Sequence, residues 1–164
     1  MGLFDFFKKK NNGKNNEESN SKKQEQLDDF TNDMINSSIF CVESYSDKYK
    51  GLNFSVKSLT VIDKILDDAS DFYEEMNKNQ RQNLINSVAS YIFEVARKNF
   101  GGRYFWYDQL KQPILVTGQP EFEVSILAFD KVKGRLENGK EDNIPFYFQG
   151  YVDSVKSKRS GMIV

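Results

Sequence analysis

Three charged residues are the best candidates for chemistry in this sequence. Glu94 and Arg97 lie three positions apart, so they share one face if the segment is helical, and Arg103 follows beyond a pair of glycines. A carboxylate oriented by a guanidinium can bind a polar ligand, and it becomes an acid–base group if a second polarising group lies beside it. The same pair can instead be a structural ion pair that fixes the glycine turn. We favour this second interpretation, because the sequence offers no nucleophile paired with a base.

Composition excludes several classes of function. The chain contains no histidine, which removes Ser-His and Cys-His catalytic pairs, histidine-bound zinc and a histidine-based pH switch. Cys41 is the single cysteine; it excludes an internal disulfide, and we interpret it as a small buried hydrophobe. The net charge of −1 argues against nucleic acid as a partner. Neither phosphate-binding glycine motif occurs, and we expect no cofactor, no metal and no catalytic residue.

The stretch 80–107 has to position these residues, and the rest of the chain is organised around it. Its first part carries apolar residues at helical spacing and predicts a helix that ends at Gly101 and Gly102. The glycines then let the backbone reverse into the aromatic run 104–107. The predicted apolar stripe of the helix consists of Leu84, Ile85, Val88, Tyr91, Ile92, Val95, Ala96 and Phe100.

The aromatic run predicts a strand with two different faces. Tyr104 and Trp106 would face one way and Phe105 and Tyr107 the other, so only one of these faces can pack on the central helix. The other face is either covered by the C-terminal helix or exposed as a contact surface. The candidate binding residues are Glu94, Arg97, Arg103, Tyr104 and Trp106.

The same spacing rules predict one α+β domain with its helices stacked on one face of a sheet. Three N-terminal helices come first, then a small three-stranded antiparallel meander, then two C-terminal helices. The predicted ranges are 24–49, 55–76, 80–100, 103–108, 112–118, 121–127, 128–139 and 144–155. The domain should span 25–157, after a flexible N-terminal tail at 1–24 and before a frayed C-terminus at 158–164. Residues of β-leaning composition make a break near Ser37 the alternative to a continuous first helix.

Acidic residues gather on the second predicted helix. They raise a metal-site hypothesis, because hard cations take several oxygen ligands. The ligand order of a calcium-binding loop is absent, however, and we interpret the cluster as a solvated acidic face. Its members are Asp63, Asp67, Asp68 and Asp71.

The N-terminal segment combines an aromatic head with a basic cluster. Its apolar residues precede its lysines, the reverse of a secretory signal, and it is too short to span a bilayer. One hypothesis is contact with an anionic membrane surface. The alternative is a terminus that frays or docks on its own domain. The residues predicted for membrane contact are Leu3, Phe4, Phe6, Phe7, Lys8, Lys9 and Lys10.

Four motifs follow one another within residues 55–155. They are S-L-x-x-I-D-x-I-L-D-D at Ser58–Asp68, Y-I-F-E-V-A-R at Tyr91–Arg97, G-G-R-Y-F-W at Gly101–Trp106 and R-L-E-N-G-K-E-D at Arg135–Asp142. Together they resemble a group of small bacterial domains of unknown function, in which a helix with a glutamate and an arginine runs into a G-G-x-W turn and a strand. The resemblance implies a bacterial origin and supplies no established activity. Related domains are suspected of acting as immunity proteins in bacterial competition.

Three hypotheses for the function follow. The first is a non-enzymatic cytoplasmic module that binds another protein through an acidic, aromatic-rich surface, with a toxin as the partner that the resemblance suggests. The second is a peripheral protein held at the inner membrane surface by the N-terminal segment. The third is an enzyme that uses carboxylates alone. We favour the first; the sequence does not specify the oligomeric state.

Overall fold

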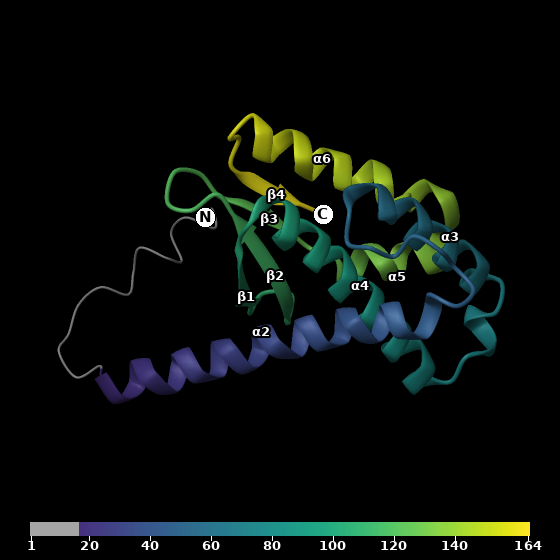
Figure 1. The fold of residues 1–164 in the computed structure, drawn as a ribbon, viewed down its shortest axis with the longest axis horizontal. Coiled ribbons are helices and arrows are strands. Elements are labelled where there is room, and N and C mark those ends of the chain that lie inside the picture. The colour runs from purple at the N-terminus through teal and green to yellow at the C-terminus, as the bar shows by residue number, and fades with distance from the viewer. Residues whose placement is uncertain (1–16) are drawn as a thin grey trace.

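The predicted helix, glycine turn and strand are all present, with the helix at the centre of the molecule and the strand at one edge of the sheet (Figure 1). The structure is a computed structural model that describes residues 17–164, with side chains from residue 29 onward. Helix α4 (Lys78–Phe100) ends at the glycine pair, and strand β1 (Arg103–Tyr107) follows at once. Every residue from Ser87 to Ala96 is buried, including Ser90, which lies outside the predicted apolar stripe. The central helix is therefore surrounded on all sides over almost three turns.

The longest helix, α2 (Glu17–Tyr45), lies along α4 and continues past the sheet (Figure 1). It runs through Ser37 without a break, as the continuous version of the first predicted helix requires. Its first residue lies inside the stretch that we expected as a flexible tail. The reason is compositional, because residues 17–26 are rich in Glu, Lys and Gln, which favour helix without needing an apolar partner.

The second predicted helix is divided into three pieces. Ser55 caps its start, because its Oγ accepts a hydrogen bond from the backbone N–H of Ser58 at 3.2 Å. The turn that it caps is the short 3-10 helix η1 (Val56–Ser58), which leads into α3 (Leu59–Ser70). A second 3-10 turn, η2 (Tyr73–Glu75), then joins α3 to α4.

Within residues 17–164 the sheet has four strands and is mixed, so the prediction of a three-stranded antiparallel sheet is wrong. β1, β2 (Gln112–Thr117) and β3 (Val124–Ile126) are antiparallel, as expected. A fourth strand, β4 (Gly161–Ile163), pairs parallel to β3 within the segment that we expected to fray. Three residues are too few to show alternation, and a parallel partner distant in sequence leaves no local pattern.

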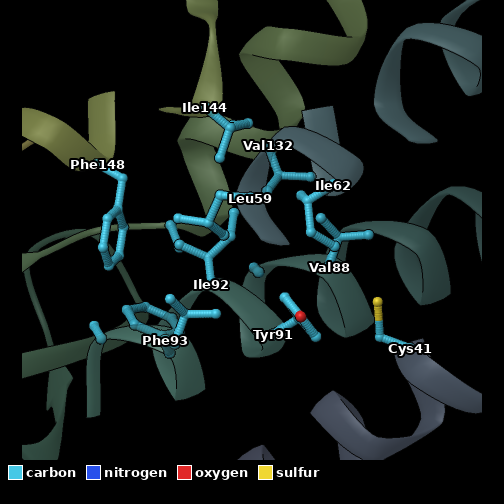
Figure 2. Close-up of a cluster of buried hydrophobic side chains, with 14 of the residues drawn as sticks. Cys41, Leu59, Ile62, Val88, Tyr91, Ile92, Phe93, Val132, Ile144 and Phe148 are labelled. Atoms are coloured by element: carbon cyan, nitrogen blue, oxygen red, sulfur yellow. The ribbon is translucent and has the colours of Figure 1, made fainter. Parts of the chain in front are cut away.

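Two helices lie between β3 and β4 in the chain. α5 (Phe129–Asn138) stops at Gly139, and a short 3-10 turn, η3 (Gly139–Asp142), leads to α6 (Ile144–Lys156). Asn143 caps α6, because its side chain accepts a hydrogen bond from the backbone N–H of Phe146 at 2.9 Å. The main core lies where α3, α4, α5 and α6 meet, as Figure 2 shows for Leu59, Ile92, Val132 and Phe148.

A second, smaller apolar cluster lies on the other face of the sheet. Ile114, Val116 and Leu127 form its buried centre. Phe105, Tyr107 and Met162 pack around them and are only partly buried. We call these six residues the outer-face cluster. The two faces of β1 thus have different environments, as its alternating aromatic residues predict.

Candidate functional site

Glu94 is the centre of the candidate site, and its side chain has no exposure to solvent. Arg97 donates from Nε to Oε1 at 2.7 Å and from Nη2 to Oε2 at 2.8 Å. The hydroxyl of Tyr104 donates to Oε1 at 2.8 Å. Both oxygens are therefore occupied, in the two-pronged arrangement that a guanidinium makes with a carboxylate. We call Glu94, Arg97 and Tyr104 the Glu94 cluster.

The glycine turn brings Tyr104 back beside Glu94. Gly101 and Gly102 have φ angles of 77° and 125°, which residues with a side chain rarely adopt. A Cβ on Gly102 would also lie 2.8 Å from the carbonyl oxygen of Val116. Thr117 Oγ1 donates to the carbonyl oxygen of Gly101 at 3.0 Å and so fastens the turn to β2. The turn therefore requires glycine for both conformation and space.

The charges of the Glu94 cluster reinforce one another. Burial, and then the charge of Glu94, raises the pKa of Tyr104 far above its usual value. The hydrogen bonds to Glu94 raise the pKa of Arg97. Tyr104 therefore remains a protonated donor, and Arg97 a cation, near neutral pH.

A row of aromatic rings leads from this cluster to the surface. Phe93 meets Tyr104 edge-on at 5.7 Å between ring centroids, and Phe30 of α2 meets Tyr104 at 6.2 Å. Phe30 also contacts the ring of Trp106 at 6.3 Å. Trp106 is 52% exposed, whereas Tyr104 is 2% exposed. We call Phe93, Tyr104, Phe30 and Trp106 the aromatic row. It ends in the indole of Trp106, which packs on Phe30 on one side and is exposed to solvent on the other.

Arg103 does not join the Glu94 cluster. It is exposed, and strand alternation places it on the face of β1 opposite to Tyr104. There it lines a shallow hollow of about 380 Å³ together with Gly102, Val116 and Gly118. Of the five candidate residues, three form one cluster, Trp106 lies at the end of the aromatic row, and Arg103 lies elsewhere.

Sequence reasoning missed a second buried ionic cluster. Arg135 of α5 is 1% exposed; it donates from Nε to Asp63 Oδ1 at 3.0 Å and from Nη2 to Asp67 Oδ1 at 2.9 Å. Asp63 Oδ1 also accepts the backbone N–H of Ile144 at 3.0 Å, at the start of α6. We call Asp63, Asp67 and Arg135 the Arg135 cluster. It ties α3, α5 and the start of α6 together, which is a structural role.

The interpretation of α3 as carrying a solvated acidic face is therefore wrong for part of it. Asp63 and Asp67 bind Arg135, and Asp68 accepts a hydrogen bond from the hydroxyl of Tyr49 at 2.6 Å. Of the four aspartates, Asp71 alone is exposed without an ion pair to a described residue. From residue 29 onward, where side chains are described, no group of three or more acidic or cysteine side chains is placed to hold a metal ion.

Cys41 is fully buried, as predicted, and faces the main core (Figure 2). Burial raises the pKa of its thiol to about 12, so it remains protonated and unreactive near neutral pH. The residues predicted for membrane contact, Leu3 to Lys10, lie outside the described residues. Within residues 17–164, no helix has both the length and the apolar character needed to cross a membrane.

Comparisons with known proteins add no relative. No family model, no curated protein and no solved structure matches the chain. The resemblance to small bacterial domains thus stays a prediction from motifs. Those motifs do contain the residues of both ionic clusters, since Glu94, Arg97, Asp63, Asp67 and Arg135 all fall within them.

Proposed function

We propose that this protein is a non-enzymatic binding module that engages another protein through a surface centred on Trp106. The single observation that carries the proposal is a half-exposed indole that packs on Phe30, whose ring in turn packs on Tyr104. Tryptophan is strongly enriched among the residues that dominate the energy of protein interfaces. A ring that is already held in place also loses little side-chain freedom on binding.

The state of Glu94 supports a binding role over catalysis. A general base has to come within hydrogen-bond reach of the proton that it removes. The Glu94 carboxylate is fully buried, and both of its oxygens already accept hydrogen bonds from Arg97 and Tyr104. The pair therefore serves as a rigid support for the aromatic row.

The surroundings of the indole suggest the chemistry of the partner. Asp29 and Asp33 are exposed on α2 on either side of Phe30 in the sequence, and Asp108 is exposed just after β1. A partner that offers an apolar pocket for Trp106 and basic groups around it would match this surface. The motif resemblance makes a bacterial toxin the first partner to test.

The single tryptophan of the chain provides a direct test. A partner purified from the native lysate should bury the indole, shift its emission to shorter wavelength and protect it from acrylamide quenching. Trp106→Ala should weaken binding by about 2 kcal/mol or more, roughly 30-fold in Kd, as measured by titration calorimetry.

A matched control distinguishes specific binding at this surface from nonspecific binding through exposed apolar side chains. Phe146 on α6 is 82% exposed, compared with 52% for Trp106. Phe146→Ala therefore removes a more exposed aromatic ring from another part of the surface. This variant should bind with the Kd of the unmodified chain. A partner that binds while the Trp106 emission stays unchanged, or that tolerates Trp106→Ala, would contradict the proposal.

A further inference from the structure

The outer-face cluster is buried, although no helix among the described residues covers it. Val116 is 1% exposed, and Ile114 and Leu127 are 2% exposed. Ser125, in the same row of the sheet as Val116, is also fully buried. Yet in the part of the chain whose side chains are described, no helix contributes a residue to this cluster. An antiparallel face without a second layer normally stands in water, so these side chains require a cover.

The cover has to be apolar, and the sequence contains one stretch suited to it. Apart from Met1, all apolar side chains of residues 1–16 fall within Leu3–Phe7. The six members of the outer-face cluster are themselves apolar or aromatic. Arg103, exposed at the edge of the same face, forms no ion pair with a described residue, and Asp5 lies in the middle of the apolar stretch.

We propose that Leu3–Phe7 docks on the outer-face cluster of its own chain and forms the second layer of that sheet face. The Phe rings cover Ile114, Val116 and Leu127, and Asp5 meets Arg103. The N-terminal segment is thereby an integral part of the domain in aqueous solution, and its lysines, Lys8–Lys10, remain in water.

The length of the connecting chain permits this docking. Glu17 begins α2, and Phe30, thirteen residues later, already contacts β1, so the start of the helix lies about 20 Å away along its axis. Crossing to the other face of the sheet adds about 10 Å. Residues 8–16 can span up to about 30 Å when extended. The straight line between the two points is shorter than this reach. Because both parts belong to one chain, docking also benefits from a high effective concentration.

Methyl NMR on the full chain tests the proposal. With Ile, Leu and Val methyls labelled, Phe4→Ser/Phe7→Ser should shift the signals of Ile114, Val116 and Leu127 by removing the ring currents above them. Leu115 on β2 and Ile126 on β3 face the helices instead, so the chemical shifts of their methyl groups should not change. Unchanged signals at the three outer methyl groups would overturn the proposal.

Two further measurements distinguish the possible occupants. Lys8→Ser/Lys9→Ser/Lys10→Ser, which removes the basic cluster and keeps the apolar residues, should leave all these methyl signals in place. The signals of the unmodified chain should also be independent of protein concentration. A dependence on concentration would make a second copy the occupant and overturn the proposal.

A measurement on the unmodified chain tests the docking without any substitution, so its result does not depend on whether a variant folds. Nuclear Overhauser cross-peaks should connect ring protons of Phe4, Phe6 or Phe7 with the methyl groups of Ile114 and Val116. Absence of these cross-peaks refutes the docking. If the rings instead contact only the acyl chains of added phosphatidylglycerol vesicles, the membrane is the occupant and the proposal is wrong.

Discussion

The two buried ionic clusters use the same chemistry in opposite ways. In the Glu94 cluster the carboxylate is the buried partner, with Glu94 fully covered and the side chain of Arg97 31% exposed. In the Arg135 cluster the guanidinium is the buried partner, at 1% exposure, and Asp63 is 15% exposed. The first joins two neighbours on one helix to the strand that follows it. The second joins residues 68 and 72 positions apart and fastens three helices. The Glu94 cluster supports a surface, and the Arg135 cluster holds the domain together.

The largest effect should come from breaking the second cluster. Arg135→Met leaves the Asp63 side chain without its cationic partner between α3, α5 and α6. Removing one partner of a buried pair typically costs about 3–5 kcal/mol of unfolding free energy. Urea denaturation measures this loss. Arg135→Lys, which keeps the charge but not the planar fork, should lose less. A loss below about 1 kcal/mol for Arg135→Met would mean that the helices are held mainly by apolar packing.

A smaller effect should follow when one donor of the Glu94 cluster is removed. Tyr104→Phe deletes the hydroxyl that donates to Glu94 and keeps the ring, so the aromatic row stays intact. A hydrogen bond to a charged group contributes about 1.5–3 kcal/mol, and chemical denaturation should show a loss in this range. Tyr107→Phe is the matched control on the same strand, because among the described residues its hydroxyl bonds only to the exposed Gln109. Equal losses in the two variants would refute the structural role of the Tyr104 hydroxyl.

Acid should weaken the Arg135 cluster over a defined range of pH. The hydrogen bond from Arg135 lowers the pKa of Asp67 below its ordinary value of 3.8. The unfolded chain therefore binds more protons than the folded chain in the range between the two pKa values, and unfolding free energy rises with pH there. The contribution of Asp67 is complete above about pH 4 and is lost as the pH falls through the lowered pKa.

The variant Asp67→Asn tests this dependence. Its unfolding free energy should fall less steeply with acid than that of the unmodified chain when denaturation is repeated between about pH 5 and pH 2. Asp71→Asn is the control, since Asp71 is exposed and has no ion pair with a described residue. A slope that Asp67→Asn leaves unchanged would contradict the coupling to Arg135.

The smallest effect should come from an ion pair of the same length in water. Lys158 Nζ lies 3.0 Å from Glu121 Oε2, the distance that also separates Arg135 Nε from Asp63 Oδ1. Both side chains are more than 65% exposed. Exposed pairs contribute about 0–1 kcal/mol, so Lys158→Met should leave the denaturation midpoint almost unchanged. A large loss would show that burial is not what separates the two kinds of pair.

Local patterns account for most of the elements that the sequence predicts correctly. The central helix, its glycine stop and the strand after it each depend on spacing or on a residue with special backbone freedom. The association of Glu94 with Arg97 was predicted because the two residues are three positions apart. The contact with Tyr104 follows once the glycine turn is assigned.

Long-range contacts account for what was missed. Nothing near Arg135 in the sequence indicates that two aspartates of α3 will surround it, and these aspartates alone resemble an ordinary solvated face. The fourth strand could not be predicted from local sequence either, because its pairing depends on β3 and on the path of α6. The early start of α2 at Glu17 has another cause, since a polar helix carries no apolar periodicity from which to place its end.

The parallel pairing of β4 with β3 has a consequence for synthesis of the chain. The sheet edge cannot close until residues 161–163 have left the ribosome, although the strand that they join is made much earlier. Until then β3 presents an open row of backbone donors and acceptors, to which a neighbouring nascent chain can add. A translational stall after α6 therefore leaves one edge of β3 unpaired and prone to aggregation.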